Sequence, residues 1–235
     1  MPPRTHFLAS ADFSRAETSR GERQAVFIDK DGTLLVDVGN NLDPALLSFT
    51  AHAIEGLHAL QGAGFALVIV AHQPGIAQQR FTRQAFARLE AALIGRLAAE
   101  GVAIDGVQLC PHAAEPRPGD SCLCRMPAPG LLRQAAISHR LHLPCSWMIG
   151  DLLDDVEAGH RAGCRSVLLD VGHETGWRQS PLRMPEHRCA DLLDAARFIL
   201  AAAPRAESCT AADRRPVLPT RLGFLPTLAA WGRSP

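Results

Sequence analysis

The chain has 235 residues, 47% of them apolar, and its formal net charge at neutral pH is zero. This length suits one medium-sized domain with appended segments, and the apolar content is enough for a sizeable core. A balanced charge excludes a general attraction to nucleic acid or to an anionic membrane surface. No run approaches the ~18 apolar residues that a membrane span needs.

The termini and the cysteines predict the organisation and the compartment of the protein. The first 23 residues are polar, lack the apolar core of a secretory signal, and predict a flexible N-terminal arm. Residues 204–235 hold five prolines and predict a loosely attached tail, which leaves 24–203 as the folded domain. Seven cysteines, three of them within fifteen residues, favour a metal site in a reducing compartment over a disulfide framework. We therefore expect a cytoplasmic protein.

Short apolar runs alternate with helical patterns from residue 24 onward. In segment 82–100, apolar residues recur every three or four positions, which is typical of a helix with one buried face. Solid apolar strands that alternate with helices favour a parallel sheet covered on both faces, a three-layer, Rossmann-like α/β sandwich. The expected strands are Ala25–Asp29, Ala66–Ala71, Val107–Leu109, Ser146–Ile149 and Ser166–Leu169, and the expected helices are Ala51–Ala63, Thr82–Glu100, Gly130–Arg140, Leu153–Ala162 and Asp191–Ala203.

Two carboxylates flank the only lysine of the chain where the first expected strand ends, in Asp29-Lys30-Asp31-Gly32. Ligands of open α/β sheets bind at the carboxyl ends of the strands. Two carboxylates there can share Mg²⁺, and one can attack phosphorus while the other handles the leaving-group proton. The alternative is an Asp-Gly turn that only ends the strand. A calcium loop is excluded, because the positions that need glycine and glutamate in an EF-hand hold leucine and asparagine.

A second acidic cluster, Gly150-Asp151-Leu152-Leu153-Asp154-Asp155, follows the fourth expected strand and opens a helix. Asp151 is expected at the same sheet edge as Asp29 and Asp31, so that three carboxylates converge there. For Asp154 and Asp155, the favourable field at a helix N-terminus is a sufficient explanation. Taken together, the two clusters predict a Mg²⁺ site.

The third cluster is Cys110-Pro111-His112 and, after nine residues, Cys122-Leu123-Cys124. Three thiolates and one imidazole form a closed ligand set for Zn²⁺, which leaves no open position for water and therefore indicates a structural site. Two such short pairs clamp the segment between them, which we expect to be a loop over the active edge of the sheet. The alternative is four unrelated residues.

These motifs together resemble the haloacid-dehalogenase-type phosphatases, over about residues 24–202. The resemblance rests on Asp-x-Asp-Gly-Thr after the first strand and Gly-Asp-x-x-x-Asp after the fourth. Cys-Pro-His and Cys-x-Cys-Arg narrow it to the subgroup that contains heptose-bisphosphate phosphatases and histidinol phosphatases. His72-Gln73-Pro74-Gly75-Ile76-Ala77, with Arg80-Phe81-Thr82, is closer to the heptose branch, which reads Asn-Gln-Ser-Gly-Ile-Ala there.

The resemblance implies a Mg²⁺-dependent phosphomonoesterase that acts on a small phosphorylated sugar, first of all a heptose 1,7-bisphosphate, through an aspartyl-phosphate. Asp29 is then the nucleophile, Asp31 is the general acid and later the base, and both hold Mg²⁺ with Asp151. The four zinc ligands implied are Cys110, His112, Cys122 and Cys124. The substrate-binding residues implied are Asp37, Gly39, Asn40, His72, Gln73 and Arg125.

Three positions depart from the pattern of that family. The second strand ends in Ala71, where the family has a hydroxyl for the transferring phosphoryl group. Met126 stands where a lysine neutralises the nucleophile and the phosphate, and Leu152 replaces another common lysine. Lys30 is expected to hold its own loop in place, so it cannot replace the missing lysines. Arg125 is then the nearest cationic residue in the sequence that could replace them. Loss of one such preorganised contact costs ~10²–10³ in rate.

Two main hypotheses therefore stand. The chain is an active phosphatase of a sugar phosphate, or it is a catalytically weakened or inactive relative that binds a phosphorylated ligand or partner. A histidinol-phosphate phosphatase is a further alternative within the same subgroup. A zinc module for nucleic acid is disfavoured, since the net charge is zero and the cysteine segments lack a basic and aromatic surface. We expect a monomer without nucleic-acid or membrane partners.

Overall fold

The structure is a computed structural model that describes residues 23–113 and 122–202. The expected N-terminal arm up to residue 22, residues 114–121 of the expected loop and the expected tail 204–235 lie outside the described residues. The domain boundaries therefore stay predictions. Within the part that the structure describes, no helix is long and apolar enough to cross a membrane.

A parallel sheet of six strands forms the centre of the described fold, with the strand order β3-β2-β1-β4-β5-β6. All five expected strands are present, with ends that differ from the prediction by one residue at most. The sixth, β6, was not predicted, because it has only three residues and two of them are exposed. The strands are β1 (Ala25–Asp29), β2 (Ala66–His72), β3 (Gly106–Cys110), β4 (Trp147–Gly150), β5 (Arg165–Leu169) and β6 (His187–Cys189).

All five expected helices are present and alternate with the strands. Local signals set their ends: the Thr82 hydroxyl accepts from the amide of Ala85 at 3.1 Å, and Gly163 ends a helix with a φ of 97°. The helices are α1 (Ala53–Gly62), α2 (Arg83–Ala99), α3 (Gly130–His139), α4 (Leu153–Ala162) and α5 (Leu192–Ala202). Three short 3₁₀ helices, η2 (Pro44–Leu46), η3 (Leu143–Cys145) and η4 (Pro181–Arg183), lie in the connections.

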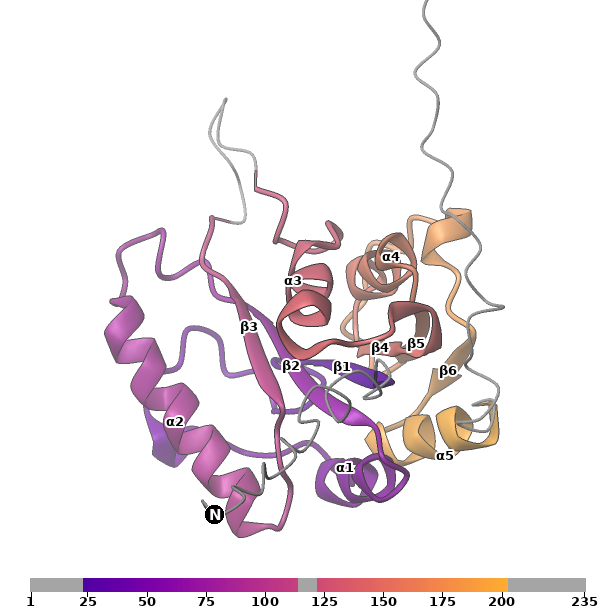
Figure 1. Cartoon of the computed structure of the whole chain (residues 1–235). Coiled ribbons are helices and arrows are strands. Elements are labelled where there is room, and N and C mark those ends of the chain that lie inside the picture. The colour runs from indigo at the N-terminus through magenta and orange to yellow at the C-terminus, as the bar shows by residue number, and fades with distance from the viewer. Residues whose placement is uncertain (1–22, 114–121, 203–235) are drawn as a thin grey trace, which may run out of the picture. The chain divides into compact units, whose positions relative to one another are not determined.

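Helices cover both faces of the sheet and give the three layers that the sequence predicts (Figure 1). Alternate side chains of each strand point to opposite faces. Val26 and Ile28 of β1 pack in one core with α1, α2 and α5, while Phe27 packs in a second core with Leu131 and Leu132 of α3. Val156 of α4 packs on β5 on the same face as α3. The predicted α/β sandwich is therefore confirmed.

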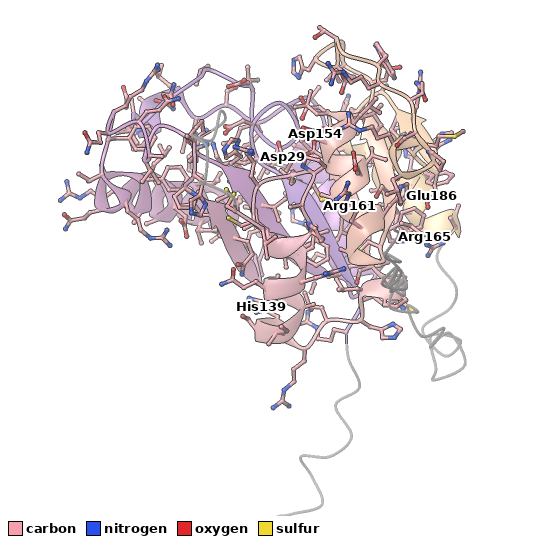
Figure 2. The ribbon with its side chains drawn as sticks, turned by 90° about the horizontal axis from the view of Figure 1, so that it is seen from above. Asp29, His139, Asp154, Arg161, Arg165 and Glu186 are labelled. Atoms are coloured by element: carbon pink, nitrogen blue, oxygen red, sulfur yellow. The ribbon has the colours of Figure 1, made fainter. Side chains whose placement is uncertain are left out.

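The parallel arrangement brings the carboxyl ends of β1, β2 and β4 together at one edge. Asp29 pairs in register with Val70 of β2, and Ile28 pairs with Ile149 of β4. Figure 2 shows Asp29 and Asp154 at this edge and His139, the last residue of α3, at the other end of the molecule. The motifs singled out in the sequence therefore leave the sheet at one place.

Candidate active site

A buried cluster of three carboxylates lies at this edge of the sheet. Asp29 ends β1, Asp151 follows β4, and Asp155 lies in the first turn of α4. Each offers one oxygen, and these oxygens lie within 4.8 Å of one another. All three residues are buried. Oxygen ligands at this spacing on rigid elements suit a hard divalent cation such as Mg²⁺.

Two glycines let the carboxylates approach the backbone this closely. Gly32 has a φ of 88°, and a Cβ there would lie 2.3 Å from an oxygen of Asp151. A Cβ on Gly150 would lie 2.2 Å from an oxygen of Asp155. Glycine is needed where the backbone turns left-handed or where another group comes too near for a side chain. The two motif glycines are therefore part of the cluster's geometry.

Hydrogen bonds hold Asp151 and Asp155 in place. The Thr33 hydroxyl donates to one oxygen of Asp151 at 2.9 Å, and Nδ1 of His173 lies 2.7 Å from the other. The backbone amide of Leu152 donates to Asp155 at 3.1 Å, so this carboxylate also caps α4. The positions of both carboxylates are therefore fixed by hydrogen bonds within the chain.

Three negatively charged carboxylates that are buried this close together repel one another, which is unfavourable without a cation. Burial and the Asp155 and Asp151 carboxylates raise the pKa of Asp29 well above its usual range. Burial and Asp151 likewise raise the pKa of Asp155 well above its usual range. A divalent cation among the three oxygens removes this repulsion. The donor set therefore fits Mg²⁺.

Asp31 lies beside the cluster and has different partners. Its Oδ2 accepts a hydrogen bond from Nε2 of Gln73 at 2.7 Å, and its Oδ1 pairs with Lys30 Nζ. Burial raises the pKa of Asp31, although Lys30 opposes the shift. The side chain of Asp31 thus stands apart from the three clustered oxygens, and its raised pKa suits a group that delivers a proton. Lys30 braces its own loop, as the sequence predicts.

A cavity of about 340 Å³ opens over the carboxylates. Five of the six predicted substrate-binding residues line it, together with the predicted catalytic pair. Arg125 is absent from the lining, and its Nη1 donates to the carbonyl of Ala113. The lining residues are Asp29, Asp31, Asp37, Gly39, Asn40, His72, Gln73, Pro74, Met126, Leu152, Asp154 and Asp155.

Two of the three departures from the family pattern also lie in this lining. Met126 and Leu152 present apolar side chains to the cavity, where the resemblance leads us to expect lysines. Ala71 is almost fully buried in β2 and lies outside the lining. Within the described ranges, no lysine or arginine lines the cavity.

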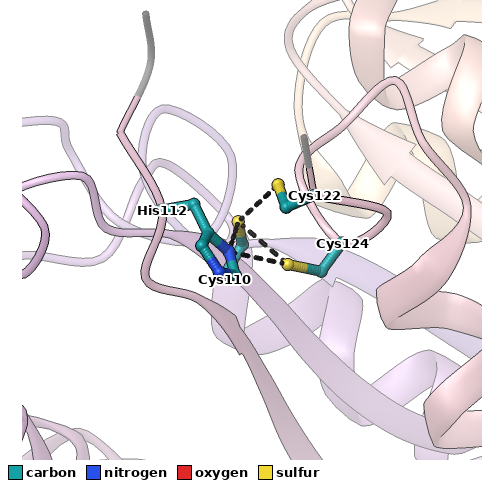
Figure 3. Close-up of side chains that lie close together, drawn as sticks. All are labelled: Cys110, His112, Cys122 and Cys124. Carbon is teal, nitrogen blue, oxygen red and sulfur yellow. Dashed lines mark hydrogen bonds between the residues drawn. The ribbon is translucent and has the colours of Figure 1, made fainter. Parts of the chain in front are cut away.

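A second cluster joins the end of β3 to the segment before α3 (Figure 3). Nδ1 of His112 lies 3.6 Å from Sγ of Cys110 and 3.1 Å from Sγ of Cys124. Sγ of Cys110 lies 3.3 Å from that of Cys124 and 4.0 Å from that of Cys122. The four donors thus surround one point, as the ligands of a tetrahedral ion do.

The chemistry of these four donors fits Zn²⁺. Burial and the neighbouring thiols raise the pKa of Cys110, so it does not ionise readily by itself. A zinc ion deprotonates its thiol ligands and takes three sulfurs and one nitrogen as a closed set. The structure thus brings together all four residues that the sequence predicts as zinc ligands.

Two backbone carbonyls connect this second cluster to the active-site edge. Nε2 of His72 lies 2.8 Å from the carbonyl oxygen of His112. The backbone amide of Gln73 donates to the carbonyl of Cys110 at 2.9 Å. The ends of β2 and β3 therefore hold the two sites side by side.

Three residues in or beside the carboxylate cluster are not among the site residues that the sequence predicts. The field at a helix N-terminus is a sufficient explanation for Asp155 in the sequence, although this residue is the last one of Gly-Asp-x-x-x-Asp. Thr33 belongs to Asp-x-Asp-Gly-Thr, so a signal was present for it as well. His173 comes from the connection after β5 and carries no motif, so only the folded chain reveals it.

Comparisons with known proteins agree with this geometry. Residues 123–195 match the family model described as HAD-hydrolase-like. The chain is 36% identical over 150 residues to the D-glycero-β-D-manno-heptose-1,7-bisphosphate 7-phosphatase of Pasteurella multocida, covering 63% of this chain and 81% of that protein. The protein of the same name from Photorhabdus laumondii is 39% identical over 148 residues, covering 62% and 79%.

A solved structure supports the same assignment. The D,D-heptose 1,7-bisphosphate phosphatase of B. bronchiseptica, complexed with magnesium and phosphate, superposes with a TM-score of 0.62 at 25% identity. The match covers 77% of this chain and 99% of that one. The chain therefore belongs to the haloacid-dehalogenase-like phosphatase family, in the branch of the heptose-bisphosphate phosphatases.

Proposed function

We propose that the protein is a Mg²⁺-dependent phosphomonoesterase that removes the 7-phosphate of D-glycero-D-manno-heptose 1,7-bisphosphate. The observation that carries the proposal is the buried triad Asp29, Asp151 and Asp155 beneath a cavity that Asp31 also lines. The names of the relatives supply the substrate. The thiols of Cys110, Cys122 and Cys124 are free, which favours a reducing compartment, and on this ground we place the protein in the cytoplasm.

Asp29, Asp151 and Asp155 are the residues that would hold Mg²⁺. When bound, the cation neutralises the carboxylates and lets the phosphate dianion approach the nucleophile. The backbone of Asp31 is a further candidate ligand, while its side chain keeps the hydrogen bond from Gln73.

The reaction then follows from the positions of two aspartates. A carboxylate oxygen of Asp29 attacks phosphorus, and the bond from phosphorus to the sugar oxygen breaks while the Asp31 carboxyl gives its proton to that oxygen. The aspartyl-phosphate is hydrolysed when water attacks phosphorus and Asp31 takes the proton of the water. Breakage of the bond between phosphorus and Asp29 releases inorganic phosphate and restores both carboxyl groups.

Four thiol and imidazole donors, those of Cys110, His112, Cys122 and Cys124, would hold a structural Zn²⁺. A closed site leaves no position for water, so its contribution is to hold together the two chain segments that supply its ligands. This role is separate from the chemistry at Asp29.

One observation favours a second candidate, a weakened relative that binds a phosphorylated ligand without fast turnover. Met126 lines the cavity in place of a lysine, and among the described residues no cationic side chain other than a histidine lines it. The transferring phosphoryl group then depends on Mg²⁺ for most of its charge compensation. Retention of Asp31 favours the active enzyme, because a binding protein does not need a general acid.

Phosphate release from heptose 1,7-bisphosphate tests the proposal, with purified wild type and Asp29→Asn in the presence and absence of Mg²⁺. We expect Mg²⁺-dependent release that falls by roughly 10⁴-fold or more in the variant, because a residue of the reacting unit is lost. Equal rates for both proteins would refute the assignment of Asp29. No release by wild type, with tight binding of the bisphosphate, would establish the second candidate instead.

A further inference from the structure

One histidine links the proposed zinc site to the wall of the catalytic cavity. His72 is the last residue of β2 and pairs in register with Cys110 on β3. His72 is one of the residues that line the cavity, and its Nε2 lies 2.8 Å from the carbonyl oxygen of His112. The same residue therefore belongs to the cavity wall and contacts the second cluster.

The chemistry of this contact fixes its direction. A carbonyl oxygen only accepts, so Nε2 of His72 must carry the hydrogen and donate it. The bond orients the backbone of His112, whose ring nitrogen lies 3.1 Å from Sγ of Cys124.

The position of His112 matters because the zinc ligands come from two separate pieces of chain. Cys110 and His112 leave β3, while Cys122 and Cys124 precede α3. The four donors close on one ion only if the backbone of both pieces is held in place. Groups that orient ligands in this way commonly contribute 10–100-fold in metal affinity.

We propose that His72 is a positioning residue that fastens the zinc-binding turn to the wall of the catalytic cavity. Its hydrogen bond holds His112 ready for zinc, so zinc in turn fixes the cavity wall that His72 forms. The inference rests on the zinc site proposed above and requires no phosphatase activity.

The test measures how fast the zinc-loaded protein gives up its metal to excess 4-(2-pyridylazo)resorcinol, a coloured chelator. His72→Leu removes the donor, and His72→Gln restores an N–H group at similar reach. His58→Leu is the matched control, because Nε2 of His58 also lies 2.8 Å from a backbone carbonyl, that of Glu100, outside both sites. Thermal melts establish that each variant is folded.

We expect His72→Leu to release zinc about 10-fold faster than wild type, at the lower end of the range for such orienting groups. His72→Gln and His58→Leu should stay close to the wild-type rate. The proposal is overturned if His72→Leu releases zinc no faster than His58→Leu, or if His72→Gln is as fast as His72→Leu. A wild-type protein that retains no zinc also overturns it, while the phosphate-release assay judges the phosphatase separately.

Discussion

The two clusters of this molecule lie side by side but differ in almost every physical respect. The carboxylate cluster draws its side chains from β1, the end of β4 and α4, and the backbone there is held by the sheet and a helix. The sulfur cluster, formed by Cys110, His112, Cys122 and Cys124, draws its side chains from the end of β3 and from a short segment before α3. The carboxylate cluster forms only when the whole sheet has folded, whereas the residues of the sulfur cluster come from two short sequence motifs.

The donor atoms of the two clusters favour different roles for them. Oxygen ligands beneath an open cavity suit a cation that takes part in phosphoryl transfer. Three sulfurs and one nitrogen around one point suit a cation that only holds chain segments together. Damage to the first site should abolish chemistry and spare the fold, whereas damage to the second should lower the stability of the fold.

Among the substitutions that test this division between the sites, the largest effect is expected from Asp155→Asn on Mg²⁺-dependent phosphate release. The substitution removes one of three clustered carboxylates, so we expect kcat/KM to fall by about 10²–10³ and the Mg²⁺ requirement to rise. Asp154→Asn is the matched control, since this carboxylate also lines the cavity but lies outside the triad and pairs with Arg183. Steady-state rates over a Mg²⁺ titration measure both. Equal effects of the two substitutions would mean that Asp155 is not a ligand.

The next largest effect is expected from Cys124→Ser, which tests whether the sulfur cluster stabilises the fold. With one thiolate lost, we expect the protein to lose its zinc and about 2 kcal/mol of unfolding free energy, or about 4–8 °C in Tm. Metal analysis and calorimetry measure the two quantities. Cys164→Ala is the control, because this buried thiol lies outside the cluster and should lower the Tm without loss of zinc. Zinc retained by Cys124→Ser would contradict the proposed site.

A smaller effect, and a gain, is expected from Met126→Lys. An ammonium group in the cavity lining compensates phosphate charge, so kcat should rise about 10-fold, less than the full range for a preorganised contact. Leu123→Lys adds the same charge at a side chain that is 82% exposed and outside the lining, and should leave kcat unchanged. If both substitutions give the same kcat, the cavity does not lack a cation.

The smallest effect concerns an ion pair that belongs to neither site. His160 of α4 donates to Glu186 across 3.1 Å and to the carbonyl of Leu182 at 2.8 Å. The hydrogen bond to Glu186 raises the pKa of His160. Its contribution is therefore complete below the unfolded pKa of about 6.5 and is lost as pH rises through the folded pKa.

We therefore expect His160→Gln to cost about 0.5–1 kcal/mol at pH 6 and less at pH 9, as for partly solvated pairs. Denaturant unfolding at the two pH values measures this difference. Zinc content and Mg²⁺-dependent activity should not change. A stability cost that grows with pH would contradict the charged pair.

The sequence predicts most of this fold because solid apolar runs and amphipathic segments mark the strands and helices directly. It misses β6, where His187 and Arg188 are exposed and only Cys189 is buried, so no apolar run exists. Boundaries of β4 and α1 shift by one or two residues, because propensity does not fix where pairing with a neighbour stops.

The two candidate sites could be predicted from the sequence to different degrees, because some of their residues lie in local motifs and others meet only in the folded chain. All four sulfur-cluster residues come from two spacings that are visible in the sequence. Asp155 carried a motif signal, but its placement against Asp29 depends on the contact between Gly150 and α4. His173 reaches Asp151 from 22 residues away along a connection without any pattern, and such a contact exists only in the folded chain.

The most direct test of the division between the sites is a Mg²⁺ titration of phosphate release from heptose 1,7-bisphosphate, with protein that holds one zinc per chain. We predict no release without Mg²⁺ and a rate that saturates as Mg²⁺ is added, at constant zinc content. Release that is independent of Mg²⁺ would contradict the account, because the carboxylate cluster would then have no part in the chemistry.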